Sequence, residues 1–282
     1  MNLQTKKILY IDLQRKLAEV KSDANLKKYI GGVGIGLKLL SENQDRDPVV
    51  FSIGPLNGFF PFCSKTSIVL NDNGTIEDTY IGGSFGSRMQ FAGIDSIVLT
   101  GRSRIPLTLE IEDESVTFRE AETDLGTIGL PGKRSILYFD KNSQELLVDR
   151  YFSSPEKFLE RKFLEKNIYN VVVTGTKVYD IPDSEKYDVL YNKILNQKDN
   201  LTVTSDSFPS CVGCPMGCQK SKIGEVGGNV LAHSLVACSY AEKIFTDVGN
   251  VFSCLNILGY DYTHEDIENF PEQIRKIMET LS

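Results

Sequence analysis

Short apolar runs bounded by Gly, Pro, Asn and Asp dominate the chain up to about residue 150. Runs of this length and spacing are typical of β-strands. They are not separated by regular helical stretches, which favours sheet meanders with occasional helices over a strict β-α-β alternation. We therefore predict strands within the following stretches: residues 8–11, 49–53, 67–70, 96–99, 107–111 and 135–139, with a further buried strand at 169–173.

Helical periodicity is sparse in this first part and prevails in the rest of the chain. Residues 35–42 are expected to form one helix. Residues 154–166 are expected to form another, with Ser154 as the N-cap before Pro155 at the first helical position. The later stretches with helical character are residues 183–198, 226–258 and 263–281, the last of which is amphipathic.

These patterns predict an α+β fold in two parts. A sheet-rich N-terminal domain is expected over residues 1–180, because the character of the sequence changes after residues 181–183. A short, mostly helical region with a cysteine-rich loop is expected over residues 181–282. No internal repeat or low-complexity segment is visible.

Composition is ordinary for a globular protein and narrows the range of partners. Of 282 residues, 41% are hydrophobic and 24% are charged, and the net charge is −7. Lys and Arg are scattered, whereas a nucleic-acid surface needs them clustered, so no nucleic-acid partner is expected. No stretch approaches the about 20 apolar residues of a membrane span. The N-terminal apolar run is broken by Asp12 and Arg15, so no signal peptide is expected either.

A cytoplasmic location follows from these observations, and it changes how the cysteines are interpreted. In that compartment the six cysteines are expected to be reduced thiols or metal ligands rather than disulfides. Cys211, Cys214 and Cys218 form a C-x2-C-x3-C run with Gly and Pro between them. Such a loop can turn its thiolates toward one centre, and soft thiolate ligands select iron–sulfur clusters, zinc or copper(I). The spacing favours a cluster.

Two alternatives to a cluster stay open. Structural zinc normally has four ligands in two close pairs, and the nearest further candidates are His233, Cys238 and Cys254, none of them paired. Cysteines can also serve as small buried hydrophobes. That second interpretation suits Cys63, Cys238 and Cys254, which have apolar surroundings.

Two glycine clusters suggest places of close backbone approach. Residues 31–36, GGVGIG, resemble a phosphate-binding loop superficially, but a helical rather than a strand-like segment precedes them. A close-packed turn between two helices is an equally good interpretation. Residues 82–86, GGSFG, form the second cluster, where backbone can approach a ligand.

Taken in order, these segments resemble the aldehyde:ferredoxin oxidoreductases, a family of tungsten- or molybdenum-pterin enzymes. The motifs that carry the resemblance are YIGGVGIG at 29–36, GPLNG at 54–58, GGSFG at 82–86 with FAGID at 91–95, VVVTGTK at 171–177, the cysteine run, and NILGYD at 256–261. They span nearly the whole chain, although the stretch 178–210 is shorter than in the family.

The resemblance implies a fold, two cofactors and an activity. It implies an N-terminal domain of two sheets that holds a tungsto- or molybdopterin, and a [4Fe–4S] cluster on the three clustered cysteines and a distant fourth. The pterin contacts that it implies are Lys65, Gly82, Gly83, Gly259 and Asp261. The family oxidises aldehydes to carboxylic acids and passes the electrons through the cluster to ferredoxin, while the protein supplies orientation and the electron path.

Several positions depart from the family pattern. Lys65 stands where the family has an arginine, which keeps the charge but loses the planar fork. Tyr80 replaces an asparagine, and Asn256 replaces the first aspartate of its motif. Glu156 stands where a phosphate-binding arginine is expected, and a carboxylate there would repel a pterin phosphate. The second pterin segment and the distant cysteine have no counterpart in these 282 residues.

Three functions are therefore weighed. The first is an oxidoreductase of the aldehyde:ferredoxin type, complete by itself or with a partner chain that supplies the other half. The second is a cluster-only electron-transfer subunit without pterin. The third is a non-catalytic paralogue that keeps the fold as a scaffold. A ferredoxin-like electron carrier and a homo- or hetero-oligomeric assembly are the expected partners.

Overall fold

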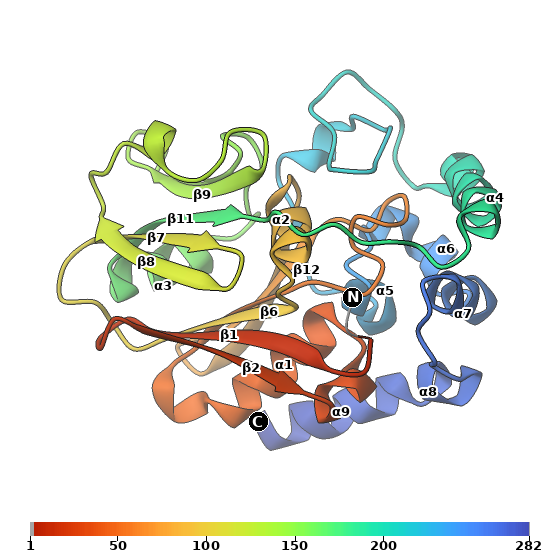
Figure 1. Ribbon diagram of the computed structural model, residues 1–282, viewed down its shortest axis with the longest axis horizontal. Helices are drawn as coiled ribbons and strands as arrows, with labels where there is room; N and C mark the ends of the chain where they lie inside the picture. Colours follow the sequence, from red (N-terminus) through yellow and green to blue (C-terminus); the bar gives the residue numbers. More distant parts are fainter. Residues whose placement is uncertain (1–2, 282) are drawn as a thin grey trace.

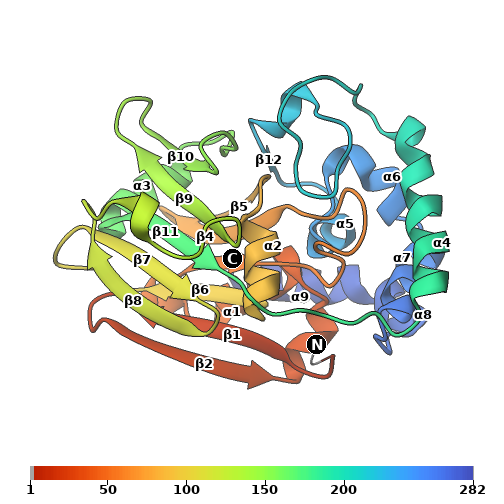
Figure 2. The same cartoon turned by 45° about the horizontal axis from the view of Figure 1, so that its top comes forward.

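Two mixed β-sheets, with helices packed on and beside them, make up the architecture of this computed structural model, which describes residues 3–281 (Figure 1). The two sheets lie one above the other, on the left in Figure 1, and most helices of the C-terminal part lie beside them on the right (Figures 1 and 2). The α+β class and the two-sheet domain predicted from the sequence are thus confirmed. Among the described residues, no helix is both long enough and apolar enough to cross a membrane.

The larger sheet has seven strands in the order β12-β5-β4-β3-β6-β1-β2. Its strands are β1 (Lys6–Asp12), β2 (Leu17–Asp23), β3 (Val49–Ser52), β4 (Thr66–Asp72), β5 (Thr75–Ile81), β6 (Ser96–Thr100) and β12 (Glu225–Val226). β1 and β6 are parallel, and the other neighbours are antiparallel. The short edge strand β12 comes from the C-terminal part of the chain.

The smaller sheet has five strands in the order β10-β9-β11-β7-β8. Its strands are β7 (Leu107–Glu112), β8 (Ser115–Glu120), β9 (Arg134–Asp140), β10 (Glu145–Val148) and β11 (Ile168–Thr174). β11 lies parallel to β7 and antiparallel to β9. All seven strands predicted from the apolar runs are present in the two sheets.

The helices are more numerous than the sequence pattern suggested, and apart from α1, which begins three residues earlier than expected, they are shorter. They are α1 (Gly32–Glu42), α2 (Phe85–Ala92), α3 (Phe158–Lys166), α4 (Ser184–Leu195), α5 (Val230–Ser234), α6 (Glu242–Phe245), α7 (Val248–Ile257), α8 (His264–Glu268) and α9 (Phe270–Leu281). Short 3-10 turns cover residues 25–29, 44–46, 125–127, 196–200, 219–221 and 239–241. The expected helical stretch at 226–258 is divided into three helices with turns between them.

The predicted N-cap at Ser154 is wrong. Helix α3 begins four residues later, with Lys157 as its N-cap and no side-chain capping bond. The Ser154 hydroxyl is buried and lies 2.9 Å from the hydroxyl of Thr79 on β5. It is therefore engaged in holding this loop to the larger sheet, and it is not available to the helix.

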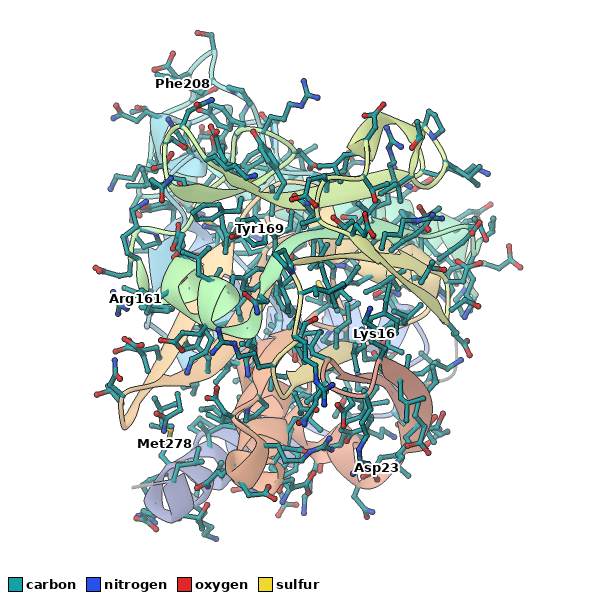
Figure 3. All side chains as sticks on the ribbon, turned by 90° about the vertical axis from the view of Figure 1, so that its left-hand side faces the viewer. Lys16, Asp23, Arg161, Tyr169, Phe208 and Met278 are labelled. Carbon is teal, nitrogen blue, oxygen red and sulfur yellow. The ribbon has the colours of Figure 1, made fainter. Side chains whose placement is uncertain are left out.

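Alternate residues of the central strands face two different apolar cores, as the pleat of a strand requires. On β3, Val49 and Phe51 face the core between the two sheets, whereas Val50 faces the opposite side. Phe51 packs against Phe85 of α2 and Phe163 of α3, at ring-centroid distances of 5.7 Å and 6.1 Å. Side chains fill the space between the layers (Figure 3). This first core is built almost wholly from residues before 175.

The second core lies on the other face of the larger sheet and joins the two parts of the chain. Helix α1 packs on β3 and β4, and α5 and α9 pack on α1. Buried residues of this core range from Ile8 to Ile277. A boundary near residue 180 stays a prediction, but the helical region shares a core with the sheet domain.

The glycine cluster at 31–36 forms the closely packed beginning of α1, with Gly31 as the N-cap and residues 32–36 inside the helix. Gly32 has a φ of +43°, and a Cβ atom there would lie 2.1 Å from the carbonyl oxygen of His233. A Cβ at Gly31 would lie 2.8 Å from the carbonyl oxygen of Ser234. The chain's own backbone thus occupies the space beside these glycines, and this beginning of α1 lies against α5.

Candidate functional site

The cysteine run lies in an irregular loop that is tied to the segment before it. The N–H of Asp206 donates to the carbonyl of Met216 at 2.8 Å, and the N–H of Phe208 donates to that of Gly217 at 2.9 Å. Gly217 has a φ of +50°, and a Cβ there would lie 2.6 Å from two backbone oxygens. Only glycine satisfies both restrictions. The sequence Gly-Cys at 217–218 therefore turns the third cysteine inward, and Cys218 is 8% exposed.

A second segment approaches this loop from α5. Residues 236–238 pair with residues 62–65 like a short antiparallel ladder, centred on a bridge between Cys63 and Ala237. The N–H of Cys238 donates to the carbonyl of Phe62 at 3.0 Å, and the N–H of Lys65 donates to that of Val236 at 3.2 Å. This pairing places Cys238 beside Lys65.

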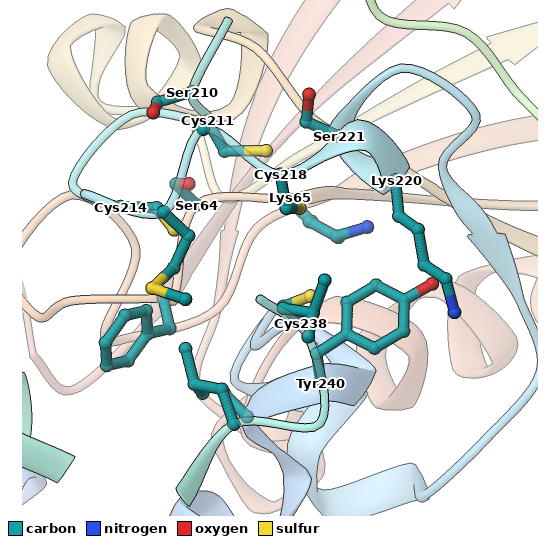
Figure 4. A pocket seen from close by; sticks show the side chains of 16 residues that line it. Ser64, Lys65, Ser210, Cys211, Cys214, Cys218, Lys220, Ser221, Cys238 and Tyr240 are labelled. Atoms are coloured by element: carbon teal, nitrogen blue, oxygen red, sulfur yellow. The ribbon is translucent and has the colours of Figure 1, made fainter. Parts of the chain in front are cut away.

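Four cysteines and Lys65 line one cavity between the loop and this ladder (Figure 4). Its walls are otherwise formed mainly by apolar side chains and short polar ones. The lining residues are Phe62, Ser64, Lys65, Leu201, Val203, Ser210, Cys211, Cys214, Met216, Gly217, Cys218, Lys220, Ser221, Cys238, Tyr240 and Ala241. The structure therefore adds Cys238 to the three cysteines that the sequence singled out.

Backbone N–H groups are directed at three of the four sulfurs. Cys211 accepts from the N–H of Gly83, Cys214 from that of Met216, and Cys238 from that of Tyr240. Burial raises the pKa of Cys214 to about 11 and that of Cys238 to about 12, and these N–H groups oppose the rise. Donors of this kind favour a thiolate over a thiol, and hydrogen bonds to sulfur tune iron–sulfur clusters.

Lys65 is paired inside the protein. Its Nζ lies 3.2 Å from Glu225 Oε1, and the two side chains are 3% and 8% exposed. Burial by itself would lower the pKa of Lys65, but Cys238, Glu225 and Cys211 raise it above the usual lysine range. Glu225 also accepts from the N–H of Ser239 at 3.1 Å and from its hydroxyl. The carboxylate that neutralises Lys65 is thus carried by β12 and fixed by the residue after Cys238.

The glycine pair at 82–83 lies next to the cysteine loop, but side chains occupy the space beside it. A Cβ at Gly82 would lie 2.6 Å from the sulfur of Cys211 and 2.9 Å from the ring of Phe152. A Cβ at Gly83 would lie 2.6 Å from a methyl of Val148 and 2.8 Å from the same ring. The pair serves close packing against these groups.

The side chain of Tyr80, just before the glycine pair at 82–83, is packed inside the protein. It is 1% exposed, its ring centroid lies 3.8 Å from that of His233, and its hydroxyl donates to Asp78. Burial lowers the pKa of His233, which favours the neutral ring. His233, one of the fourth-ligand candidates from the sequence, does not line the cysteine cavity.

The remaining residues that the resemblance singled out lie at the surface. Asp261 pairs with Lys27, and its side chain is 57% exposed. Gly259 has a φ of +88°, and its nearest neighbours are Leu3 and Pro182. Glu156 is exposed. None of these three residues lines the cysteine cavity.

The thiols share a cavity without converging on a point. Among residues 3–281, no three His, Cys, Asp or Glu side chains are grouped closely enough to hold a single metal ion. Four thiolates around one zinc ion would lie about 3.8 Å apart, given Zn–S bonds of about 2.3 Å in a tetrahedron. A cubane cluster places each thiolate on a different iron, so its ligands stand farther apart.

Comparison with known proteins shows which proteins this chain is similar to. Residues 8–135 match the domain described as "Aldehyde ferredoxin oxidoreductase, N-terminal domain". The tungsten-containing aldehyde ferredoxin oxidoreductase of Pyrococcus furiosus is 24% identical over 216 residues, which are 65% of this chain and 35% of the relative. These matches support a partial and divergent member of the aldehyde ferredoxin oxidoreductase family, with the family domain matched over residues 8–135.

Two further matches extend the comparison. The WOR-like subunit of the aliphatic sulfonate oxidoreductase of Pyrococcus furiosus is 33% identical over 147 residues, 46% of this chain and 23% of the relative. The active site complex BamBC of benzoyl coenzyme A reductase, solved with 1,5-dienoyl-CoA, superimposes with a TM-score of 0.60 at 20% identity. That match covers 77% of this chain and 38% of the other, and it supports the fold. The chain thus spans no more than 38% of the length of these matched proteins.

Proposed function

We propose that this family member is an iron–sulfur electron-transfer protein that acts as one component of a larger oxidoreductase. The single observation that carries the proposal is the cavity lined by Cys211, Cys214 and Cys218, in which backbone N–H groups are directed at the sulfurs of Cys211 and Cys214. An iron–sulfur cluster held there would take up and release electrons one at a time.

The residues of this chain hold the cofactor and set its surroundings. The cysteine loop supplies thiolates, and the apolar walls limit access of water, which affects the potential. Lys65 places a positive charge beside the sulfurs and so offsets part of the negative charge of thiolate ligands. Oxidoreductase kinship supports an electron-transfer role over a purely structural one.

A tungsto- or molybdopterin does not fit the residues present. Lys65, the side chain expected to contact it, is neutralised by Glu225. Phe152 and Val148 occupy the space beside Gly82 and Gly83. A pterin with phosphate groups needs positive or N–H-rich surroundings, and these positions offer too few free donors. We therefore propose no aldehyde oxidation by this chain alone.

Assembly with other chains is part of the proposal. One relative is named as a subunit, and the structural neighbour is a complex of more than one protein. A ferredoxin-like carrier or a catalytic partner chain would exchange electrons with the cluster. The acidic net charge of −7 favours a carrier or partner with a basic contact face.

The test is the composition of protein purified without oxygen. We expect brown protein with a broad visible absorption that bleaches on reduction, together with iron and acid-labile sulfide. Cys214→Ser should lose most of the iron, whereas Cys254→Ser, at a buried cysteine outside the cavity, should retain it. Colourless protein with one zinc per chain would refute the proposal.

The same preparation tests whether the chain holds a tungsto- or molybdopterin. We expect no stoichiometric tungsten or molybdenum and no aldehyde oxidation with a viologen acceptor. Stoichiometric tungsten with activity on any simple aldehyde would instead establish the catalytic function. In that case the side chains around Gly82 and Gly83 would have to move.

A further inference from the structure

We propose that Cys238 is the fourth protein ligand of the cluster, so that this chain holds all four ligands by itself. The inference rests on the proposed cluster at Cys211, Cys214 and Cys218 and adds a ligand that the spacing of the cysteines does not suggest. It makes the site independent of any cysteine supplied from elsewhere.

The geometry that carries the inference is the shared cavity. Cys238 lines it together with the three loop cysteines, and it reaches the cavity from the opposite wall (Figure 4). The loop contributes three thiols from one side, and the segment after α5 contributes one from the other. A cubane cluster needs ligands on four corners, and three ligands from one short loop leave one corner to be bound from across the cavity.

The position of Cys238 is held by the backbone on both sides. Its N–H is bonded to the carbonyl of Phe62, and Ala237 is bridged to Cys63. The next residue, Ser239, donates its N–H and its hydroxyl to Glu225. A thiol fixed between two such anchors keeps one orientation, as a ligand must.

Comparison with the other two cysteines separates a ligand from a core residue. Cys63 and Cys254 are fully buried at 0% exposure, line no part of this cavity, and lie in the apolar core that α1 shares with the helical region. Cys238 is half-buried, as Cys211 and Cys214 are. Like these two cysteines, it accepts a backbone N–H, in its case from Tyr240.

The charges around Cys238 also suit a thiolate ligand. Lys65 lines the same cavity as Cys238 and Cys211. Binding to iron requires loss of the thiol proton, and a nearby ammonium group stabilises the resulting anion. Glu225 keeps Lys65 in place through the 3.2 Å contact.

The experiment compares three cysteine variants of the full chain, each reconstituted anaerobically with ferrous iron and sulfide. Iron and sulfide per chain and the EPR spectra of oxidised and reduced samples are the readouts. Wild type should hold about four irons, and Cys238→Ala should hold about three and give the oxidised EPR signal of a three-iron cluster. Cys254→Ala is the matched control and should behave as wild type.

The outcomes separate this inference from the proposed function. If wild type takes up no iron and sulfide, the proposed cluster itself is absent and both statements fail. If wild type and Cys214→Ser differ as expected, but Cys238→Ala keeps four irons and the wild-type spectra, then the cluster exists and Cys238 is not its ligand. Loss of the fourth iron in Cys238→Ala, but not in Cys254→Ala, supports the inference.

A second measurement avoids the risk that a variant fails to fold. Loaded wild-type protein is treated anaerobically with iodoacetamide, before and after the cluster is removed, and each cysteine is followed by peptide mass spectrometry. Cys238 should be protected in the loaded protein and alkylated after removal, in parallel with Cys211 and Cys214. Equal alkylation of Cys238 in both states would overturn the inference. Cys254 is the internal control, because its burial should protect it in both.

Discussion

Replacement of Glu225 by glutamine tests the electrostatics of the site most directly. The substitution keeps the shape and the acceptor for Ser239 but removes the charge that neutralises Lys65. Both side chains are less than a tenth exposed, so the remaining ammonium would be buried without a counter-charge. Breaking a buried pair in this way costs about 3–5 kcal/mol, a large share of the about 5–15 kcal/mol that stabilises a typical domain.

An exposed ion pair on the same chain provides the control. Glu272 and Arg275 are paired on α9, but their side chains are 50% and 58% exposed. Removing such a pair by Glu272→Gln should change the free energy of unfolding far less, because solvent and salt screen the two exposed charges. Replacing both buried partners, in Lys65→Met with Glu225→Leu, should recover most of the loss, because no unpaired charge remains.

The assay is anaerobic urea unfolding followed by far-ultraviolet circular dichroism, with all variants at the same iron content. Together with the single variants Lys65→Met and Glu225→Leu, the free energies of unfolding give the interaction energy of Lys65 and Glu225 through a double-mutant cycle. If Glu225→Gln costs no more than Glu272→Gln, the reasoning from burial is refuted. The same result would mean that Lys65 is free to serve another group.

Three further predictions concern other parts of the fold. Gly32→Ala should lower the free energy of unfolding by more than about 4 kcal/mol or prevent folding, because the added Cβ would lie 2.1 Å from a backbone oxygen. Its control is Gly74→Ala, at a φ of +92° with open space around it, which should cost about 1–2 kcal/mol. Equal effects of the two substitutions in urea unfolding would contradict this prediction. A fragment of residues 1–180 should keep the strand signal in circular dichroism. It should also bind a hydrophobic dye, because the face of α1 that the helical region covers would be exposed to solvent. Loss of the strand signal would refute the domain boundary. Burial opposes ionisation of Asp47, but two lysines of α3 hold the pKa of its carboxyl group below the ordinary range in the folded protein. The contribution of these ion pairs to folding stability is therefore fully present above pH about 4, and it is lost as the pH falls through the lowered pKa of the folded state. Asp47→Asn should therefore reduce stability at pH 7 but not at pH about 2, and a constant difference across that range would argue against the pair.

The sequence predicts the buried strands well and the edge strands poorly. Strands such as β3 and β11 are apolar on both faces, and continuous apolar runs reveal them. β2, in contrast, has mostly exposed residues and forms because its backbone pairs with β1. Its residues carry no hydrophobic signal, so only the tertiary pairing reveals it.

In the candidate site too, features set by neighbouring residues could be predicted from the sequence, whereas features set by contacts between distant segments could not. The loop cysteines are visible because their spacing is local. From the sequence, Cys238 was one of three unpaired candidates for a fourth zinc ligand and was otherwise interpreted as a core residue, since nothing in its neighbourhood indicates the bridge between Cys63 and Ala237. Lys65 was assigned to a pterin contact, and its pairing with Glu225 depends on β12 joining the edge of the sheet. In both cases the decisive contact lies more than a hundred residues away along the chain.

The two-residue strand β12 and the ladder between residues 62–65 and 236–238 also affect the order of folding. Both join segments that are separated by most of the chain, and contacts of such high sequence separation form late because their loop-closure entropy must be overcome first. The N-terminal strands can pair as soon as they leave the ribosome, but the cavity has no second wall until residues 225–241 have been synthesised. A four-ligand site would accordingly form only after residues 225–241 have been made, and until then the three loop thiols would lack the opposite wall that covers them.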